Sequence, residues 1–273
     1  MDQLGGGGEP MPALYDRIGH SYDVTRRPDP YLTGCIVAAL GRMEGRLCLD
    51  LACGSGNYTL ALAGHGVSVH GTDRALTMIR SAARKGALSG ARVTWTVADA
   101  VALPFPSGVF GGALCTLALH HFPELAPVFA EVRRTLAGGR FVVFTATREQ
   151  MAGYWLHEYF PRAIERSARV MPGYDEIMGS LREAGFGGVR VEPYEVAPDL
   201  QDLFLYSGKH RPCMYLDPAV RANISTFATL ADPREVEEGC ARLAGDIASG
   251  RIHEVVRSHP SRDGDYMFVV ASP

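Results

Sequence analysis

The sequence predicts an α/β fold built on a doubly wound, mostly parallel sheet. Two observations lead to this prediction. Between residues 46 and 147, short apolar strands alternate with single helices. Strands joined in this way pair in parallel through right-handed crossovers, so helices cover both faces of the sheet. The first strand also runs into a glycine-rich turn that opens a helix, at the edge where open α/β sheets bind ligands.

The alternating elements follow from the positions of apolar, β-branched and turn-forming residues. Runs of apolar and β-branched residues mark the strands, and glycines close the helices. We expect strands at 46–51, 67–71, 93–97, 109–119 and 141–147, and helices at 31–40, 58–64, 75–85 and 125–136.

After residue 147 the alternation gives way to a mainly helical region. Amphipathic patterns predict helices at 151–170 and 174–184, a strand at 189–196, only helical segments across 199–252, and a last strand at 265–271. The late helical block therefore forms a cap inserted before the last strand. We divide the chain into a disordered tail (1–12), N-terminal helices (13–40), a core (41–198 with 264–273) and a cap (199–263, with 148–172 contributing).

Composition excludes several classes of protein. An apolar fraction of 47% and a charged fraction of 21% are typical of globular chains. A net charge of −3 gives no general attraction for nucleic acid or anionic membrane. The six cysteines form no CxxC pair, so we expect neither disulfides nor a metal site. Without an export signal or an apolar run of about 20 residues, we expect a cytoplasmic monomer or homodimer that acts on a small molecule.

The most informative segment reads DLACGSGN from Asp50 to Asn57. Gly54 and Gly56 allow the backbone to approach a ligand closely, and the N–H groups at the following helix start face a polar or anionic group. The third glycine of dinucleotide-binding folds is replaced by Thr59. Asp50 precedes the glycines, where a carboxylate repels a pyrophosphate but suits a ligand that carries an ammonium group.

Two further acids follow the next strands. Asp73 ends the second strand, about 20 residues beyond the glycines, where an acid accepts both hydroxyls of a ribose. Asp99 follows the third strand, where a carboxylate accepts an exocyclic amine. Taken singly, each acid is more often a turn or capping residue. Three acids at the ends of three neighbouring strands instead indicate one ligand-binding crevice.

Four segments stand out together: DLACGSG from Asp50, GTD from Gly71 with Met78 beyond it, ADAVALPFP from Ala98, and LALHHF from Leu117. Together they resemble the class I S-adenosylmethionine-dependent methyltransferases, in particular the ubiquinone/menaquinone-biosynthesis-like (methyltransferase type 11) group. The resemblance covers roughly residues 15–196. It implies a Rossmann-like sheet of seven strands whose last strand is antiparallel, with S-adenosylmethionine as the cofactor.

By position, the resemblance also implies cofactor contacts. The methionine part meets the turn, the ribose meets the second strand end, and the adenine meets the third strand end and the helix before it. The residues are, in that order, Asp50, Ala52 and Gly54; Asp73; and Asp99, Ala100 and Met78, with Leu117 beside the sulfonium. Gly56 is a further cofactor-binding candidate in the same turn. The chain departs from the family at Ala52, where glycine is usual, and at Arg74, which either stacks near the adenine or points to water.

The N-terminal helices resemble the family's lid. Tyr22 would close over the cofactor, and Arg26 could pair with its carboxylate through a bidentate contact. Tyr15 stands seven positions before Tyr22 and is a candidate substrate contact. Alternatively, the two tyrosines only mark one face of a helix.

Methyl transfer requires the acceptor to be held in line with the sulfonium and water to be excluded. A general base is needed only where an O–H or N–H loses its proton. His120 and His121 follow the fourth strand beside the expected methyl position, and imidazole suits this task. Alternatively, the pair shapes the turn into Phe122 and Pro123.

Aromatic residues with a few cations mark the cap as the substrate region. Such walls fit a planar or carboxylate-bearing small molecule, although aromatic residues at helical spacing are often packing residues. The candidate contacts are Tyr154, Trp155, His157, Tyr206, His210 and Arg211.

Three other functions compete with this prediction. A quinone-like or lipid acceptor would fit the group name, but no basic amphipathic helix marks a membrane surface. Arsenic methylation needs converging cysteines, and only Cys53 and Cys115 are expected near the site. A cofactor-binding module without catalysis, acting as a regulator or partner subunit, would share the binding motif and differ only in lacking a second pocket at the sulfonium.

Overall fold

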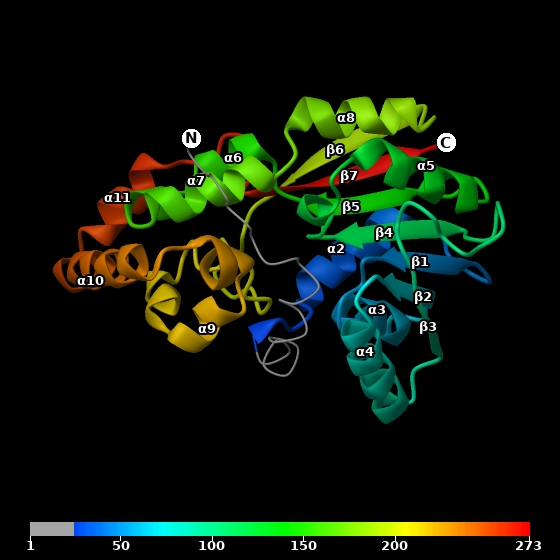
Figure 1. Ribbon diagram of the computed structural model, residues 1–273, viewed down its shortest axis with the longest axis horizontal. Helices are drawn as coiled ribbons and strands as arrows, with labels where there is room; N and C mark the ends of the chain where they lie inside the picture. The colour runs from blue at the N-terminus through cyan, green and yellow to red at the C-terminus, as the bar shows by residue number, and fades with distance from the viewer. Residues whose placement is uncertain (1–24) are drawn as a thin grey trace, which may run out of the picture.

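The computed structural model describes residues 25–273. Its centre is a seven-stranded sheet in the order β3-β2-β1-β4-β5-β7-β6 (Figure 1). The strands pair in parallel except for β7, which runs antiparallel to both β5 and β6. The bounds are β1 Leu47–Leu51, β2 Ser68–Asp73, β3 Val93–Val97, β4 Gly112–Thr116, β5 Phe141–Thr145, β6 Gly188–Tyr194 and β7 Tyr266–Ser272. The predicted doubly wound sheet with an antiparallel last strand is confirmed.

Two hydrophobic layers cover the faces of this sheet, because successive side chains of a strand point to opposite faces. Cys48 packs on one side with α2 (Pro30–Leu40) and α3 (Asn57–Gly64). Its neighbour Leu49 packs on the other side with α5 (Leu125–Thr135) and α8 (Tyr174–Glu183). The helix α4 (Leu76–Ser89) contacts β2 and β3 at the edge. This layering leaves the carboxyl ends of the parallel strands open to a ligand.

The late helices gather beside the sheet, at the left in Figure 1. They are α6 Arg148–Ala152, η2 Trp155–Glu158, α7 Pro161–Val170, η3 Pro212–Leu216, α9 Pro218–Ala222, η4 Thr226–Leu230, α10 Pro233–Ser249 and α11 Ile252–Ser258. We call this group the cap. Many of its aromatic side chains join the core cluster that also covers the α2 face of the sheet. No helix in residues 25–273 is both long enough and apolar enough to cross a bilayer.

One prediction for the cap is wrong in detail. The helix expected at 151–170 is three pieces, namely α6, η2 and α7. Gly153 ends the first piece, Tyr154 has extended backbone angles, and Pro161 begins the third. Proline is well tolerated in a first helical turn but not inside a helix, which explains the break. The break matters because it directs the side chains of Tyr154 and Trp155 into the core of the cap, where both are buried.

Candidate functional site

A cleft of about 210 Å³ lies at the carboxyl ends of β1 to β4. The turn after β1 forms its floor, with left-handed backbone angles at Ala52, Gly54 and Gly56. Of these three positions, Gly56 tolerates a side chain least, because a Cβ there would lie 2.4 Å from the ring of Trp95. Glycine takes this conformation freely, whereas other residues are strained by it. The sequence thus fixes the sharp turn that exposes the backbone of the β1 loop to the cleft.

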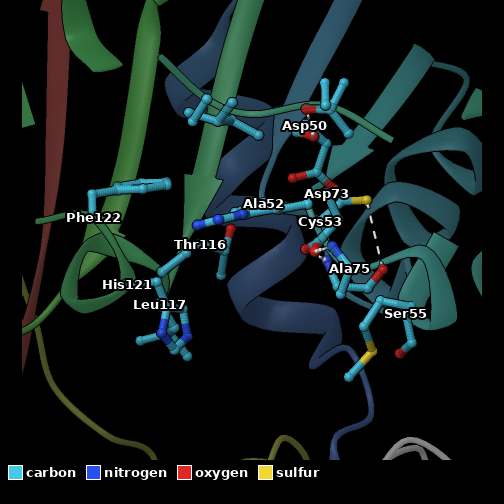
Figure 2. A pocket seen from close by; sticks show the side chains of 18 of the residues that line it. Asp50, Ala52, Cys53, Ser55, Asp73, Ala75, Thr116, Leu117, His121 and Phe122 are labelled. Carbon is cyan, nitrogen blue, oxygen red and sulfur yellow. Dashed lines mark hydrogen bonds between the residues drawn. The ribbon is translucent and has the colours of Figure 1, made fainter. Parts of the chain in front are cut away.

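Asp73 at the end of β2 fastens that turn. One carboxylate oxygen accepts a hydrogen bond from the Gly54 N–H at 2.8 Å, and the other accepts one from the Ala75 N–H at 2.8 Å. Burial raises the pKa of Asp73, while these backbone hydrogen bonds oppose the rise. Figure 2 shows Asp50 and Asp73 on one side of the cleft, and Leu117 and His121 on the other. Asp73 therefore holds the β1 turn and lines the cleft beside it.

Asp50 at the end of β1 is buried, and within residues 25–273 its carboxylate accepts one side-chain hydrogen bond, from the Thr59 hydroxyl at 2.5 Å. Burial raises the pKa of Asp50 to about 7; the hydrogen bond from Thr59 lowers it, and the charge of Asp73 raises it further. A carboxylate in such surroundings gains most from a nearby cation. The floor of the cleft is therefore suited to a positively charged group.

The structure brings most of the sequence-predicted cofactor residues to this cleft. Those that line it are Arg26, Asp50, Ala52, Gly54, Asp73, Arg74, Met78, Asp99, Ala100 and Leu117. Gly56 does not line the cleft and instead stands at the N-cap of α3, behind the turn. Tyr15 and Tyr22 lie outside the described residues. The predicted set thus converges on one place, although its members are far apart in sequence.

A second cavity, of about 260 Å³, adjoins the cleft under the cap. Arg26, Leu117 and His121 line both spaces and so form their junction. Leu117 has a left-handed backbone (φ 53°), which is unusual for a leucine and places its peptide at the junction. Such strained conformations cluster at functional sites. A molecule in the second cavity would therefore face whatever the cleft holds.

The two histidines stand at this junction. The rings of His120 and His121 are 3.9 Å apart between centroids. Burial and the nearby charge of Arg26 lower the pKa of His120 to about 4. Burial and the neighbouring His120 lower the pKa of His121 well below its usual value. Both imidazoles are therefore neutral at physiological pH, which is the form that accepts a proton.

Arg26 has a protein partner that sequence patterns did not reveal. Its Nε lies 2.6 Å from the carboxylate of Asp202, which is almost completely buried. The Tyr58 hydroxyl on α3 donates to the same carboxylate at 3.1 Å. Arg26 and Asp202 both line the cleft. Since the two residues are 176 positions apart, no motif spacing could have paired them.

The six candidate substrate residues of the cap line neither cavity. Tyr154 stacks on Tyr206 with centroids 3.8 Å apart, and its hydroxyl donates to the Asp265 carbonyl oxygen. Trp155 is fully buried, and His157 is half exposed beside Glu165. The other two contact the connecting backbone, His210 at the Val196 carbonyl oxygen and Arg211 at that of Leu200. Of the six, Tyr154 also packs against Tyr266 of β7, with ring centroids 6.1 Å apart.

Beyond Arg26, Leu117, His120 and His121, the residues that line the second cavity were missed by the sequence analysis. They come from α6, α7, the α9–η4 region, β7 and connecting loops, and most are aliphatic or hydroxyl-bearing. Examples are Met151, Ser167, Phe204, Thr226 and Tyr266. Such residue types carry no chemical signature in a sequence, so only the packing of the cap identifies them.

The known proteins that this chain resembles in sequence are methyltransferases. A family model described as a methyltransferase domain matches residues 48–139. The chain is 28% identical over 214 residues to demethylmenaquinone methyltransferase from Geobacillus kaustophilus, a match that covers 68% of this chain and 89% of that protein.

Solved structures extend the likeness to the cap. A crystal structure of a putative methyltransferase from an antibiotic biosynthesis pathway of Anabaena variabilis is 30% identical, with a TM-score of 0.79, and covers 91% of this chain and 99% of its own. Phosphoethanolamine N-methyltransferase 2 from Haemonchus contortus, solved with S-adenosylmethionine, shares the fold with a TM-score of 0.64 at 18% identity, covering 97% of this chain and 60% of its own.

Proposed function

Because the chain belongs to the class I S-adenosylmethionine-dependent methyltransferases, we propose that its cleft holds the cofactor and its second cavity holds the acceptor. The observation that supports this division is the junction at Arg26, Leu117 and His121, which joins the two spaces. S-adenosylmethionine supplies an activated methyl group on a sulfonium. The protein has to hold the acceptor in line with that methyl and exclude water.

The residues of the cleft fit the cofactor chemically. Asp50 meets the cationic amino-acid end, because its buried carboxylate lacks a charged partner in the described residues near β1. Asp73 accepts the ribose hydroxyls beside the β1 turn, and Asp99 with Ala100 meets the adenine edge. Met78, which is buried beneath the cleft, packs against the adenine ring. Leu117 stands beside the sulfonium at the junction.

The histidine pair is placed to remove a proton from the acceptor. His121 lines both spaces, and burial together with the neighbouring His120 lowers its pKa, which favours the neutral imidazole. A neutral imidazole next to the methyl position takes the proton that an O–H group loses as the new bond forms. His120, in ring contact with His121, lies on the cavity side. We therefore assign His121 as the base and His120 as the residue that positions it.

Methyl transfer is tested with methyl-labelled S-adenosylmethionine and a small-molecule extract. The proposal predicts label in a small molecule, with one S-adenosylhomocysteine formed for each methyl transferred. Asp73→Ala should abolish both signals. The matched control is Asp175→Ala, on the exposed first turn of α8, which should leave both unchanged. Cofactor binding in calorimetry without any turnover would overturn the proposal in favour of a non-catalytic binding module.

A further inference from the structure

We propose that the second cavity selects a neutral, ring-sized, mainly apolar acceptor, and that Ser167 and Thr226 recognise an oxygen on its end remote from the methyl donor. This inference rests on the proposed function, because it names the acceptor class of the same site. The two hydroxyl residues line the second cavity but not the cleft. They therefore lie away from the junction where the methyl group enters.

The hydroxyl pair has bonding capacity left for a ligand. The oxygens of Ser167 and Thr226 are 2.7 Å apart, and either can be the donor. Two hydroxyls carry two hydrogens and four lone pairs, and their mutual bond uses one of each. One hydroxyl hydrogen thus remains, on side chains that are almost completely buried. A hydroxyl or carbonyl oxygen of the acceptor can accept this hydrogen inside the cavity.

The backbone around Thr226 supports a binding role. The segment η4 is a π-helical turn, a geometry that is rare and frequent at functional sites. Thr229, in the same turn, also lines the cavity, but its hydroxyl donates to the Ser225 carbonyl oxygen at 2.8 Å. The turn therefore carries one threonine hydroxyl engaged with backbone and one paired with a serine inside the cavity. This difference provides a matched control.

The charge of the cavity lining excludes an ionic acceptor. No Asp, Glu or Lys of residues 25–273 lines the second cavity. Its one permanent charge, Arg26, is neutralised by the buried Asp202. The two histidines are held neutral by burial, which lowers the pKa of each. An unpaired carboxylate or phosphate would be desolvated there without a free counter-charge, which is costly.

Apart from Asn223 and Ser225, the remaining walls are apolar. They include the rings of Phe204 and Tyr266 and several aliphatic side chains from the cap. The other apolar residues are Ala146, Met151, Val170, Met171, Leu205, Ile224 and Leu230. Pockets of this kind bind through burial of an apolar body, and a few polar groups fix its orientation. The volume of about 260 Å³ suits a fused ring pair rather than a long chain.

The test uses three probes that differ at one ring position. They are 2-naphthol, 2,6-dihydroxynaphthalene and 6-hydroxy-2-naphthoate, titrated by calorimetry into protein saturated with S-adenosylhomocysteine. We expect the diol to bind about tenfold more tightly than 2-naphthol, which is the effect of one buried hydrogen bond. The naphthoate should bind at least tenfold more weakly than the diol. Equal binding of the diol and 2-naphthol, or tightest binding of the naphthoate, would overturn the proposal.

Three single substitutions test which hydroxyl groups cause the preference for the diol over 2-naphthol. Thr226→Val removes the hydroxyl with little change of shape and should reduce the preference for the diol to less than about threefold. Ser167→Ala should do the same, and it guards against a packing defect in the first variant. Thr229→Val, whose hydroxyl is engaged elsewhere, should keep the full preference. If all three variants keep it, the oxygen is recognised elsewhere and the proposal fails. Absence of S-adenosylhomocysteine binding to the unaltered protein would instead contradict the cofactor assignment.

Discussion

The cofactor cleft and the acceptor cavity share a junction but differ in electrostatics. The cleft presents Asp50 and Asp73 at the ends of β1 and β2, and burial raises the pKa of both. The cavity presents hydroxyls, neutral imidazoles and Arg26 already paired with Asp202. A cation is therefore stabilised on one side of the junction and a neutral molecule on the other. Under the proposed assignment, this difference means that charge, more than shape, distinguishes the two ligands.

The turn after β1 gives the largest expected effect and acts only on the cleft. In Gly56→Val, the new side chain would overlap the ring of Trp95 in a backbone conformation that valine resists. We expect the free energy of unfolding to fall by about 4 kcal/mol and cofactor binding to be lost. Gly64→Val, where a Cβ meets open space, is the control and should cost less than about 1 kcal/mol. Urea unfolding and calorimetry measure the two effects. A Gly56→Val protein of unchanged stability would contradict the account of the turn.

Asp202 forms an ion pair with Arg26, which lines both the cleft and the second cavity. In Asp202→Ala, the guanidinium of Arg26 loses its carboxylate in a largely buried setting, and the Tyr58 hydroxyl loses its acceptor. We expect a loss of about 3 kcal/mol in the free energy of unfolding. Tyr58→Phe, which keeps the ion pair, should lose only about 1 kcal/mol. If both variants unfold at the same urea concentration as the parent protein, the ion pair does not join the regions.

The pH dependence of cofactor binding separates the two sites. Because the folded pKa of Asp50 is raised to about 7 from an ordinary 3.8, a cationic ligand must displace a proton below that pH. Affinity for S-adenosylhomocysteine, whose ammonium is charged, should rise by up to tenfold per pH unit below pH 7 and level off above it. Asp50→Asn should flatten this profile in calorimetry. A wild-type profile that is flat between pH 5.5 and 7 would contradict the assignment of Asp50.

The same shift has a consequence for the ligand-free protein. A carboxyl with a raised folded pKa favours the folded state fully below its unfolded pKa. That contribution of Asp50 is lost as the pH rises from about 4 through 7. The histidine pair acts in the opposite direction, because a lowered folded pKa opposes folding once the unfolded imidazoles become charged. Asp50→Asn should therefore remove the falling limb of stability between pH 4 and 7.

We expect the smallest effect from a substitution of His157, which the sequence analysis named as a candidate substrate contact. His157 is half exposed beside Glu165 and lines neither cavity. His157→Ala should change stability by less than about 0.5 kcal/mol, and it should leave turnover with the labelled cofactor unchanged. A tenfold loss of turnover would show that the cap closes differently around the acceptor.

Much of the sheet and the cleft could be predicted because both follow local rules. Alternating apolar strands and single helices dictate a parallel sheet, and the acids Asp50, Asp73 and Asp99 then fall at one edge. The turn needs glycines at fixed positions, which a sequence displays directly. Ala52 stands in this turn where the family usually has glycine, and its backbone is left-handed.

The cap resisted prediction because its cavity depends on long-range packing. Ser167 meets Thr226 across 59 positions, and neither belongs to a motif. The aromatic residues that attracted notice, such as Tyr154 and Tyr206, are drawn into the core by their size. A broken helix at Gly153 and Pro161 set their direction. Sequence patterns therefore located the helical cap but not most of the residues that line its cavity.

The central claim is that the cleft and the cavity bind different ligands at one junction. Calorimetry of S-adenosylhomocysteine with Asp73→Ala and Thr226→Val tests it most directly. The account predicts that Asp73→Ala weakens binding about 100-fold, through loss of two charge-assisted hydrogen bonds, and that Thr226→Val stays within about twofold of the parent protein. Unaltered affinity in Asp73→Ala, or an equal loss in both variants, would contradict it.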